Sequence, residues 1–332
     1  MADVPKSTTL PGASVWFVQR DDLRAYQIRG EDVRGFLHRM STNHVADDEP
    51  GQGRLNAFID RRGRMICLAQ QLTLAADHVF VAASESTSLQ TWLDQYLFAE
   101  DVAIHPEGSS GAFFSIGGPE AALFLRDTFS IEAESLAPWA GTQGEGRICF
   151  RSFDGESTQG QCQPEYVLYT SNPDDDLAKL TKAAASVSSE QYEALRVRRG
   201  MPRSNHEISS AYNPLELGLH DAIHWSKGCY IGQEVIARID NYDKQSKRLV
   251  GLVVDGKHQM HMTVGAQLMS DEKVLGVITS VAPVFEADSV NVLAMMRIAA
   301  LEQDENLVLT IGETHIPIEW RKRFNEQRPS AD

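Results

Sequence analysis

The eight residues from Lys227 to Glu234 (Lys-Gly-Cys-Tyr-Ile-Gly-Gln-Glu) bring together a cation, a thiol, an aromatic ring, an amide and a carboxylate. Apolar residues 235, 236 and 239 follow at helical spacing, so the octapeptide is predicted to run from a glycine turn into a helix start. Free backbone N–H groups at such a start, together with Lys227, would favour the thiolate form of Cys229. The pattern therefore predicts a reactive cysteine. The competing interpretation is a tight turn in which Cys229 packs as a small apolar side chain.

The other chemical groups of this octapeptide each have two interpretations. Lys227 is either a counter-charge for the thiolate or a surface lysine. Tyr230 either stacks on a ligand or fills a core. Gln233 and Glu234 either cap backbone groups near the turn or take part in catalysis.

Charge and composition exclude several classes of function. The chain of 332 residues carries a formal net charge of −15, from 46 acidic and 31 basic residues. Such a field repels phosphate backbones and anionic membranes, so direct binding to nucleic acid or to a membrane is not expected. No apolar run approaches the roughly 20 residues that span a bilayer. The first residues lack both a signal-peptide core and an arginine-rich amphipathic pattern, so a cytoplasmic protein is predicted, with flexible ends at 1–12 and 325–332.

Cysteine and histidine spacing predicts no metal site. The four cysteines form no Cys-x-x-Cys pair and lie far apart in the sequence, at Cys67, Cys149, Cys162 and Cys229. Neither a zinc site nor a chain-bound iron–sulfur cluster is indicated, and disulfides are not expected in a cytoplasmic chain. His258 and His261 are close in sequence but have no third ligand beside them.

The apolar pattern predicts α+β structure followed by an all-β region. A short strand over 25–28, a glycine turn and a helix over 31–40 are echoed at an offset of 88 residues, where 116–125 resembles 28–37. This echo predicts a duplicated α+β unit. The glycine-rich stretch 139–146 is interpreted as a surface connector. From residue 247 onward, six runs rich in β-formers predict a small barrel or sandwich, at 249–254, 263–269, 274–281, 290–298, 307–311 and 315–320.

Five motifs occur in an order that resembles one protein family. They are Gly30–Leu37 with Ser41–Val45, Asp60–Arg64, Leu195–Pro202, Asn213–Leu219, and the octapeptide at 227–234. Together they resemble the folate-binding YgfZ-type proteins, which are similar to the aminomethyltransferase (T-protein) of the glycine cleavage system. The octapeptide is the most specific of the five.

The resemblance implies an α+β fold: two related α+β domains in a ring-like arrangement around a folate pocket, plus a C-terminal six-stranded β-barrel. The corresponding ranges are 13–245 for the folate-binding region and 246–324 for the barrel. The implied function is that of a tetrahydrofolate-binding accessory factor, which supports assembly or repair of iron–sulfur clusters in client enzymes and only indirectly tRNA modification. Such a protein would be a monomer, would act through protein partners and would have no turnover of its own.

Site residues are carried over position by position. The resemblance implies Cys229 and Lys227 as the functional pair, and a folate site that draws on Asn43, Asp60, Arg64, Tyr192, Arg198, Tyr230, Gln233 and Glu234. Without the resemblance, Asp60 and Arg64 are interpreted as hairpin residues, and Tyr192 is as well explained by helix packing as by stacking on folate.

Several positions depart from the family pattern, among them His44 in place of an aspartate and Tyr192 in place of a tryptophan, and three further departures concern the folate site. Aminomethyltransferases carry an aspartate in the stretch that here ends at Leu68, and relatives carry a glutamate where this chain has Arg198. A tryptophan of the folate site falls on Leu23. Without the first carboxylate, glycine cleavage is not expected. Two alternatives follow: a tetrahydrofolate-dependent aminomethyltransferase or demethylase acting on a small amine, and a scaffold that has lost folate binding.

Overall fold

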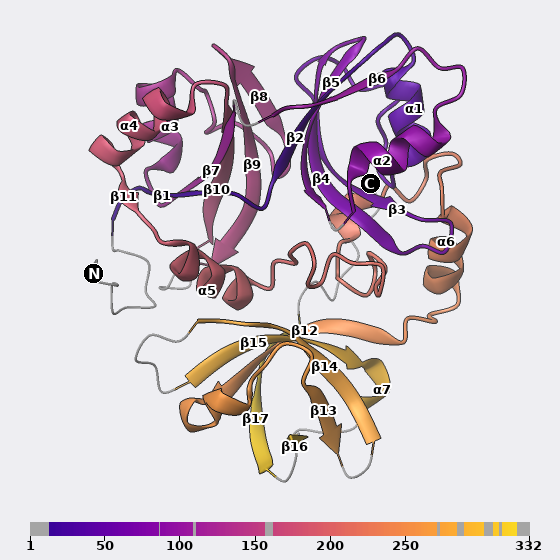
Figure 1. The fold of residues 1–332 in the computed structure, drawn as a ribbon, viewed down its shortest axis with the longest axis vertical. Helices are drawn as coiled ribbons and strands as arrows, with labels where there is room; N and C mark the ends of the chain where they lie inside the picture. The colour runs from indigo at the N-terminus through magenta and orange to yellow at the C-terminus, as the bar shows by residue number, and fades with distance from the viewer. Residues whose placement is uncertain are drawn as a thin grey trace.

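The computed structural model describes residues 13–85, 87–108, 111–156, 162–270, 273–283, 289–301, 308–311 and 314–323. Three sheets make up the molecule: two in the upper half of Figure 1 and a third below them. The predicted flexible ends at 1–12 and 325–332 lie outside the described residues. None of the helices in the described part of the chain has the length and apolar character needed to span a bilayer.

The first sheet has five strands in the order β3-β4-β5-β2-β6, all antiparallel to their neighbours. Its strands are β2 (Arg24–Arg29), β3 (Gly53–Ile59), β4 (Met65–Ala75), β5 (His78–Glu85) and β6 (Ala103–Pro106). Helix α1 (Val33–Met40) packs on this sheet because Val33, Phe36, Leu37 and Met40 form one buried stripe at helical spacing. Helix α2 (Leu89–Leu93) ends in the 3₁₀ turn η1 (Asp94–Tyr96).

The second sheet has six strands in the order β11-β1-β7-β10-β9-β8. Its strands are β1 (Trp16–Gln19), β7 (Ala112–Gly117), β8 (Gly141–Gly144), β9 (Arg147–Glu156), β10 (Cys162–Thr170) and β11 (Ala185–Ser186), with helices α3 (Ala121–Phe129) and α4 (Pro173–Ala183). Strand β8 corrects the interpretation of 139–146 as a surface connector. Glycine is a poor strand former by itself, but here Gly141 pairs with Phe150 of β9, and its backbone nitrogen lies against Gly53 of the first sheet.

The two sheets repeat one design, as the offset of 88 residues predicts. Strand β2 leads through Gly30 into α1, and β7 leads through Gly118 into α3. Both glycines have positive φ angles, +135° and +116°, and a Cβ on either would collide with a backbone carbonyl. In the first sheet β6 pairs antiparallel with β2, and in the second the N-terminal strand β1 pairs antiparallel with β7. The first strand of the chain thus completes the sheet of the second unit.

The third sheet contains the six strands of the C-terminal region. These are β12 (Lys247–Asp255), β13 (Gln267–Ser270), β14 (Lys273–Val281), β15 (Ser289–Arg297), β16 (Val308–Ile311) and β17 (Thr314–Arg323). Their pairings run β12-β15-β14-β13-β16-β17, and β17 pairs back onto β12, which closes the ring of strands. Alternate side chains of β12, β14 and β15 point inward to a shared apolar cluster. A 3₁₀ turn, η3 (Gly256–His261), and a short helix, α7 (Ile298–Leu301), complete this part.

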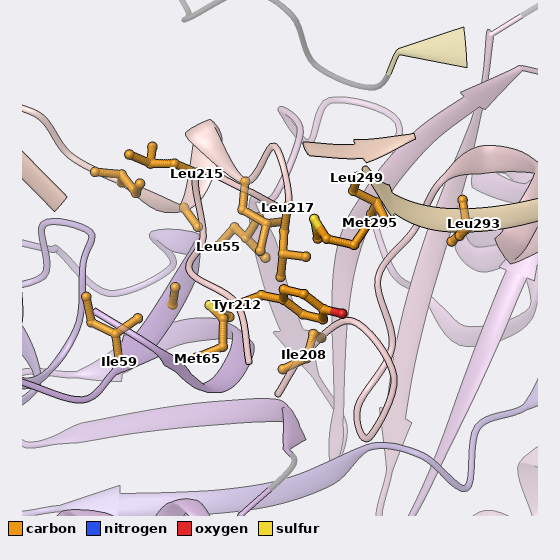
Figure 2. Close-up of a cluster of buried hydrophobic side chains, with 14 of the residues drawn as sticks. Leu55, Ile59, Met65, Ile208, Tyr212, Leu215, Leu217, Leu249, Leu293 and Met295 are labelled. Atoms are coloured by element: carbon orange, nitrogen blue, oxygen red, sulfur yellow. The ribbon is translucent and has the colours of Figure 1, made fainter. Parts of the chain in front are cut away.

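A connecting segment joins the three sheets. It runs from α5 (Ser189–Arg199) through η2 (His220–Ala222) to α6 (Gln233–Asn241), and Figure 1 shows α5 between the second sheet and the barrel. Figure 2 shows the apolar cluster it helps to form: Leu55 comes from β3, Tyr212 and Leu217 from the connecting segment, and Met295 from the barrel. Burial of this cluster fixes the barrel and the connecting segment against the first sheet.

Candidate functional site

The octapeptide forms a turn that leads into the start of α6, as its sequence predicts, and the turn is exposed at residues 228 and 229. Cys229 is exposed at this turn, whereas Cys67 and Cys149 are buried and burial raises the pKa of both thiols. Gly232 precedes the helix with a φ of +80°, and a Cβ there would lie 2.5 Å from the carbonyl oxygen of Asp60. Only glycine therefore lets the helix start approach the hairpin at 60–64 so closely.

Lys227 is 5% exposed, so the interpretation as a surface lysine is wrong. Its Nζ donates to the carbonyl oxygens of His38 and Ser41, each at 2.7 Å, and to that of Asn43. An ammonium group has three N–H donors and no lone pair, so these carbonyls use all of its donors. Burial lowers the pKa of Lys227 to about 7, while the three acceptors favour the charged form. Because the carbonyls lie at and just after the C-terminal end of α1, Lys227 anchors the octapeptide to that helix.

Three histidine rings lie beside this anchor. The ring centroids of His38 and His44 are 4.6 Å apart, and those of His44 and His224 are 5.3 Å apart. Nδ1 of His38 accepts backbone N–H bonds from residues 45 and 46. Burial, and then the nearby Lys227 charge, lower the pKa of His38 to about 4; burial, and then His44, lower that of His224. In the described part of the chain, no group of three or more histidine, cysteine, aspartate or glutamate side chains has an arrangement that could hold a metal ion.

The Asn43 side chain links two backbone segments by hydrogen bonds. It is buried, and its amide group donates to the carbonyl oxygens of Leu55 at 2.9 Å and Asp221 at 3.0 Å. Its backbone N–H donates to the side chain of Asn56. The side chain therefore ties strand β3 to the 3₁₀ turn η2.

Asp60 and Arg64 occupy the hairpin between β3 and β4. One carboxylate oxygen of Asp60 accepts the backbone N–H groups of Arg62 and Arg64, both at 2.8 Å, which closes the turn. The Arg64 guanidinium donates to the carbonyl oxygen of Ala211 and lies 3.4 Å from the carboxylate of Glu216. Both contacts hold the hairpin against the connecting segment.

Three further residues of the octapeptide, Tyr230, Gln233 and Glu234, are predicted to belong to the site. The Tyr230 ring is half-buried against the main apolar cluster, with the Lys227 ammonium 5.2 Å from its centroid. Burial raises the pKa of Tyr230 to about 12. The amide of Gln233 donates to the carbonyl oxygen of Lys227 at 3.4 Å, and Glu234 is exposed in the first turn of α6.

Tyr192 and Arg198 lie elsewhere, on α5, which Figure 1 shows well apart from α6. Tyr192 is buried; its hydroxyl accepts a hydrogen bond from Arg20 and donates one to Glu165, both at 2.7 Å. The Arg20 guanidinium also lies 4.8 Å from the centre of the tyrosine ring. Arg198 is half-buried near the end of the helix. The predicted site is thus split between the octapeptide and α5.

A central cavity of about 140 Å³ lies where the two similar sheets meet the connecting segment. Leu23 and Leu68, two of the positions that depart from the family pattern, both line it. Its other walls are mostly apolar, and its polar lining consists of Arg20, Gln70, Ser84, Trp139, Ser152 and Asp221. Two wider cavities adjoin it through Arg20, which lines all three: one of about 490 Å³ that includes Tyr192, and one of about 420 Å³.

Sequence reasoning missed the polar residues of this central cavity. Trp139 and Asp221 are 82 positions apart, yet the indole Nε1 donates to the Asp221 carboxylate at 3.1 Å. Trp139 is the first residue of the glycine-rich stretch 139–146, which the sequence predicts to be a connector, and Asp221 lies two positions beyond the motif Asn213–Leu219. No local pattern pointed to either residue.

Comparison with known proteins finds a family match for the N-terminal part of the chain. Residues 13–145 match the GCVT N-terminal domain. The resemblance to YgfZ-type and aminomethyltransferase-like proteins is therefore confirmed. At the level of the fold, the chain is similar to the aminomethyltransferase T of the glycine cleavage system from Bartonella henselae. That match has a TM-score of 0.76 at 17% identity and covers 95% of this chain and 87% of that one.

Relatives by sequence carry several names. A protein of Arabidopsis thaliana named as a chloroplastic transferase is 28% identical over 265 residues, which cover 76% of this chain and 59% of that protein. The tRNA-modifying protein YgfZ of Colwellia psychrerythraea is 25% identical over 255 residues, covering 74% of this chain and 73% of the relative. An aminomethyltransferase of Chlorobium luteolum is 22% identical, covering 70% and 66%. The chain thus spans less than two thirds of the plant and Chlorobium relatives.

Proposed function

We propose that this protein binds tetrahydrofolate in the central cavity and acts as an accessory factor for assembly or repair of iron–sulfur clusters in client enzymes. Cys229 is its functional thiol. The observation that carries the proposal is the cavity itself. It lies between the two repeated sheets, and its lining includes Leu23, where the resemblance places a tryptophan of the folate site, and Leu68, the last residue of the stretch in which relatives carry the aspartate.

The lining is chemically suited to a folate ring system. Apolar side chains such as Leu55, Val167 and Met201 can cover the faces of a flat heterocycle, while a few polar groups can orient its edge. The central volume of about 140 Å³ admits a ring system but not a whole folate. The remainder of the molecule would extend past Arg20 into one of the two wider cavities.

The exposed turn supports a separate role for Cys229. Since Lys227 is committed to the carbonyl groups after α1, it holds the turn in place, and the thiol is presented to a partner. We propose that this partner is a client or assembly protein of the iron–sulfur system, with tRNA modification affected only through such a client. We also propose a cytoplasmic monomer without direct contact to nucleic acid, with a folate-binding region over 13–245 and a barrel domain over 246–324.

The alternative is a tetrahydrofolate-dependent aminomethyltransferase or demethylase. It is favoured by the fold match and by the aminomethyltransferases among the relatives. Bound tetrahydrofolate would supply the acceptor for a one-carbon unit in such a reaction. Leu68 argues against it, because this position in the cavity wall has no carboxylate to relay a proton.

Calorimetric titration of tetrahydrofolate into the wild-type protein and into Cys229→Ala tests both halves of the proposal. We expect saturable binding of equal affinity in both proteins, because the exposed thiol is not among the residues that line the three cavities. In cells that lack the protein, Cys229→Ala should fail to restore activity of iron–sulfur enzymes that the wild type restores. Absence of binding to either protein would refute the folate half, and full restoration by Cys229→Ala would refute the thiol half. Transfer of a methyl group from a small amine to tetrahydrofolate would favour the alternative.

A further inference from the structure

The central cavity has two charged side chains in its lining, and they differ in how they are compensated. The Arg20 guanidinium forms a two-point ion pair with Asp22, at 2.7 Å for both Nε and Nη2. Its Nη1 donates to the Tyr192 hydroxyl at 2.7 Å and to the Ser115 hydroxyl at 3.0 Å. All three nitrogens are used, so the positive charge of Arg20 is balanced within the protein.

Asp221 is the carboxylate that lines this cavity among the described residues. Its Oδ2 accepts the N–H of Trp139 at 3.1 Å, and no arginine or lysine in the described part of the chain pairs with it. A neutral donor satisfies only one of the roughly four acceptor positions of a carboxylate. The charge therefore faces the cavity without an ionic partner.

The position of Asp221 is set from both sides. Asn43 holds its backbone carbonyl at 3.0 Å, within the 3₁₀ turn η2. The Asp221 carboxylate is held by the Trp139 indole. Trp139 has a positive φ of 66°, and the backbone N–H of Trp139 donates to the carbonyl oxygen of Arg151 at 3.0 Å. Asp221 itself is exposed, but hydrogen bonds from the buried Asn43 and the half-buried Trp139 fix its carbonyl and its carboxylate, so the group is already oriented before a ligand binds.

We propose that Asp221 recognises the donor edge of the ligand ring, the exocyclic amine and adjacent ring N–H of a 2-amino-4-oxo heterocycle such as the pterin of tetrahydrofolate. This inference rests on the proposed function. Two parallel N–H donors match the two oxygens of a carboxylate. Asp221 thereby supplies a carboxylate that the sequence lacks at Leu68 and Arg198, from a different segment of the chain.

The inference is tested by calorimetric titration of tetrahydrofolate into the wild type, Asp221→Asn and Asp94→Asn. Asp94 is a matched control because it is also an exposed aspartate in a 3₁₀ turn, and it lines none of the three cavities. Asparagine keeps an oxygen for Trp139 but presents a donor where the ring N–H would bind. We expect Asp221→Asn to bind about 10- to 100-fold more weakly and Asp94→Asn to match the wild type.

A tetrahydrofolate analogue without the 2-amino group separates recognition from a structural effect. It should bind the wild type more weakly than tetrahydrofolate does, and Asp221→Asn should lose little further affinity for it. A second variant, Trp139→Phe, removes only the donor that orients the carboxylate and should weaken tetrahydrofolate binding less than Asp221→Asn. If the wild type binds tetrahydrofolate and Asp221→Asn binds it equally well, this inference is overturned while the proposed function stands. If the wild type does not bind, the proposed function fails and this inference fails with it.

Discussion

At the scale of single residues, the octapeptide divides its chemistry between two side chains. From the sequence, Lys227 is either a counter-charge for the thiolate or a surface lysine, but in the structure it is buried and bonded to three carbonyl groups, so it anchors the octapeptide to the end of α1. Cys229, two positions later, is exposed. Burial lowers the pKa of His38 and of His224 beside this anchor, so lowering the pH should reduce the stability of this part of the molecule.

The free energy of unfolding should fall as the pH decreases from 7 to 4, in part because of His38. Its folded pKa of about 4 lies below its ordinary value of 6.5, so the folded state binds fewer protons in this range and stability is lost as the pH falls. In His38→Asn the amide oxygen can accept the same two backbone N–H groups without titrating. Urea unfolding followed by circular dichroism at each pH should show a shallower slope for His38→Asn. The exposed His105→Asn control should keep the wild-type slope, and equal slopes in all three proteins would contradict the assignment.

At the scale of elements, local capping interactions define the ends of α5, and side chains between those ends contact two other parts of the molecule. Ser188 and Gln191 form a reciprocal capping box at its start, and Gly200 ends it with a φ of +75°. Between these ends, Tyr192 reaches Glu165 of the second sheet, and Arg196 donates to Ser280 of the barrel at 2.7 Å. The helix therefore links the second sheet to the barrel.

Replacing Ser188 by alanine should lower the free energy of unfolding by about 1 kcal/mol, because the N–H of Gln191 loses its acceptor. Ser189→Ala is the matched control, since its side chain is not the cap, and its effect should stay within about 0.5 kcal/mol. Urea titration monitored by tryptophan fluorescence measures both. Equal losses in the two variants would show that the capping box does not stabilise α5.

At the scale of the whole molecule, the repeated sheets meet at a close backbone contact. Gly53 of β3 lies against residues 139–141 at the start of β8, and the central cavity is lined from both sheets. The geometry of that cavity therefore depends on how closely the two sheets approach. The barrel is fixed to the same region through the apolar cluster shown in Figure 2.

Gly53→Ala should lower the free energy of unfolding by about 1–3 kcal/mol, because its Cβ would lie 2.6 Å from the backbone nitrogen of Gly141 and the strands would have to separate. The same separation should weaken tetrahydrofolate binding, if the proposed site is correct. Gly144→Ala in β8 is the control: its Cβ would meet nothing within 4 Å, so neither stability nor binding should fall. Thermal unfolding and calorimetry measure the two effects. A Gly53→Ala protein as stable as Gly144→Ala would contradict this account of sheet packing.

The sequence by itself determined the features that depend on near neighbours. The buried stripe of α1, the turn that leads into α6 and the repeat at an offset of 88 residues all follow from spacing within short segments. Residues 89–98 carry apolar side chains at helical spacing throughout, yet α2 ends at Leu93 and the last residues form a 3₁₀ turn and a loop. Such ends depend on weak local preferences that packing overrides.

Only the tertiary structure decided which chemical groups meet. Lys227 reaches a carbonyl group 184 positions away, and Trp139 reaches Asp221 across 82 positions. A glycine-rich stretch became strand β8 because a partner strand and the close approach of Gly53 suited it. Hydrogen-bond satisfaction and steric fit are properties of the folded neighbourhood, so residue types and spacing alone could predict a reactive motif but not the residues that line the central cavity.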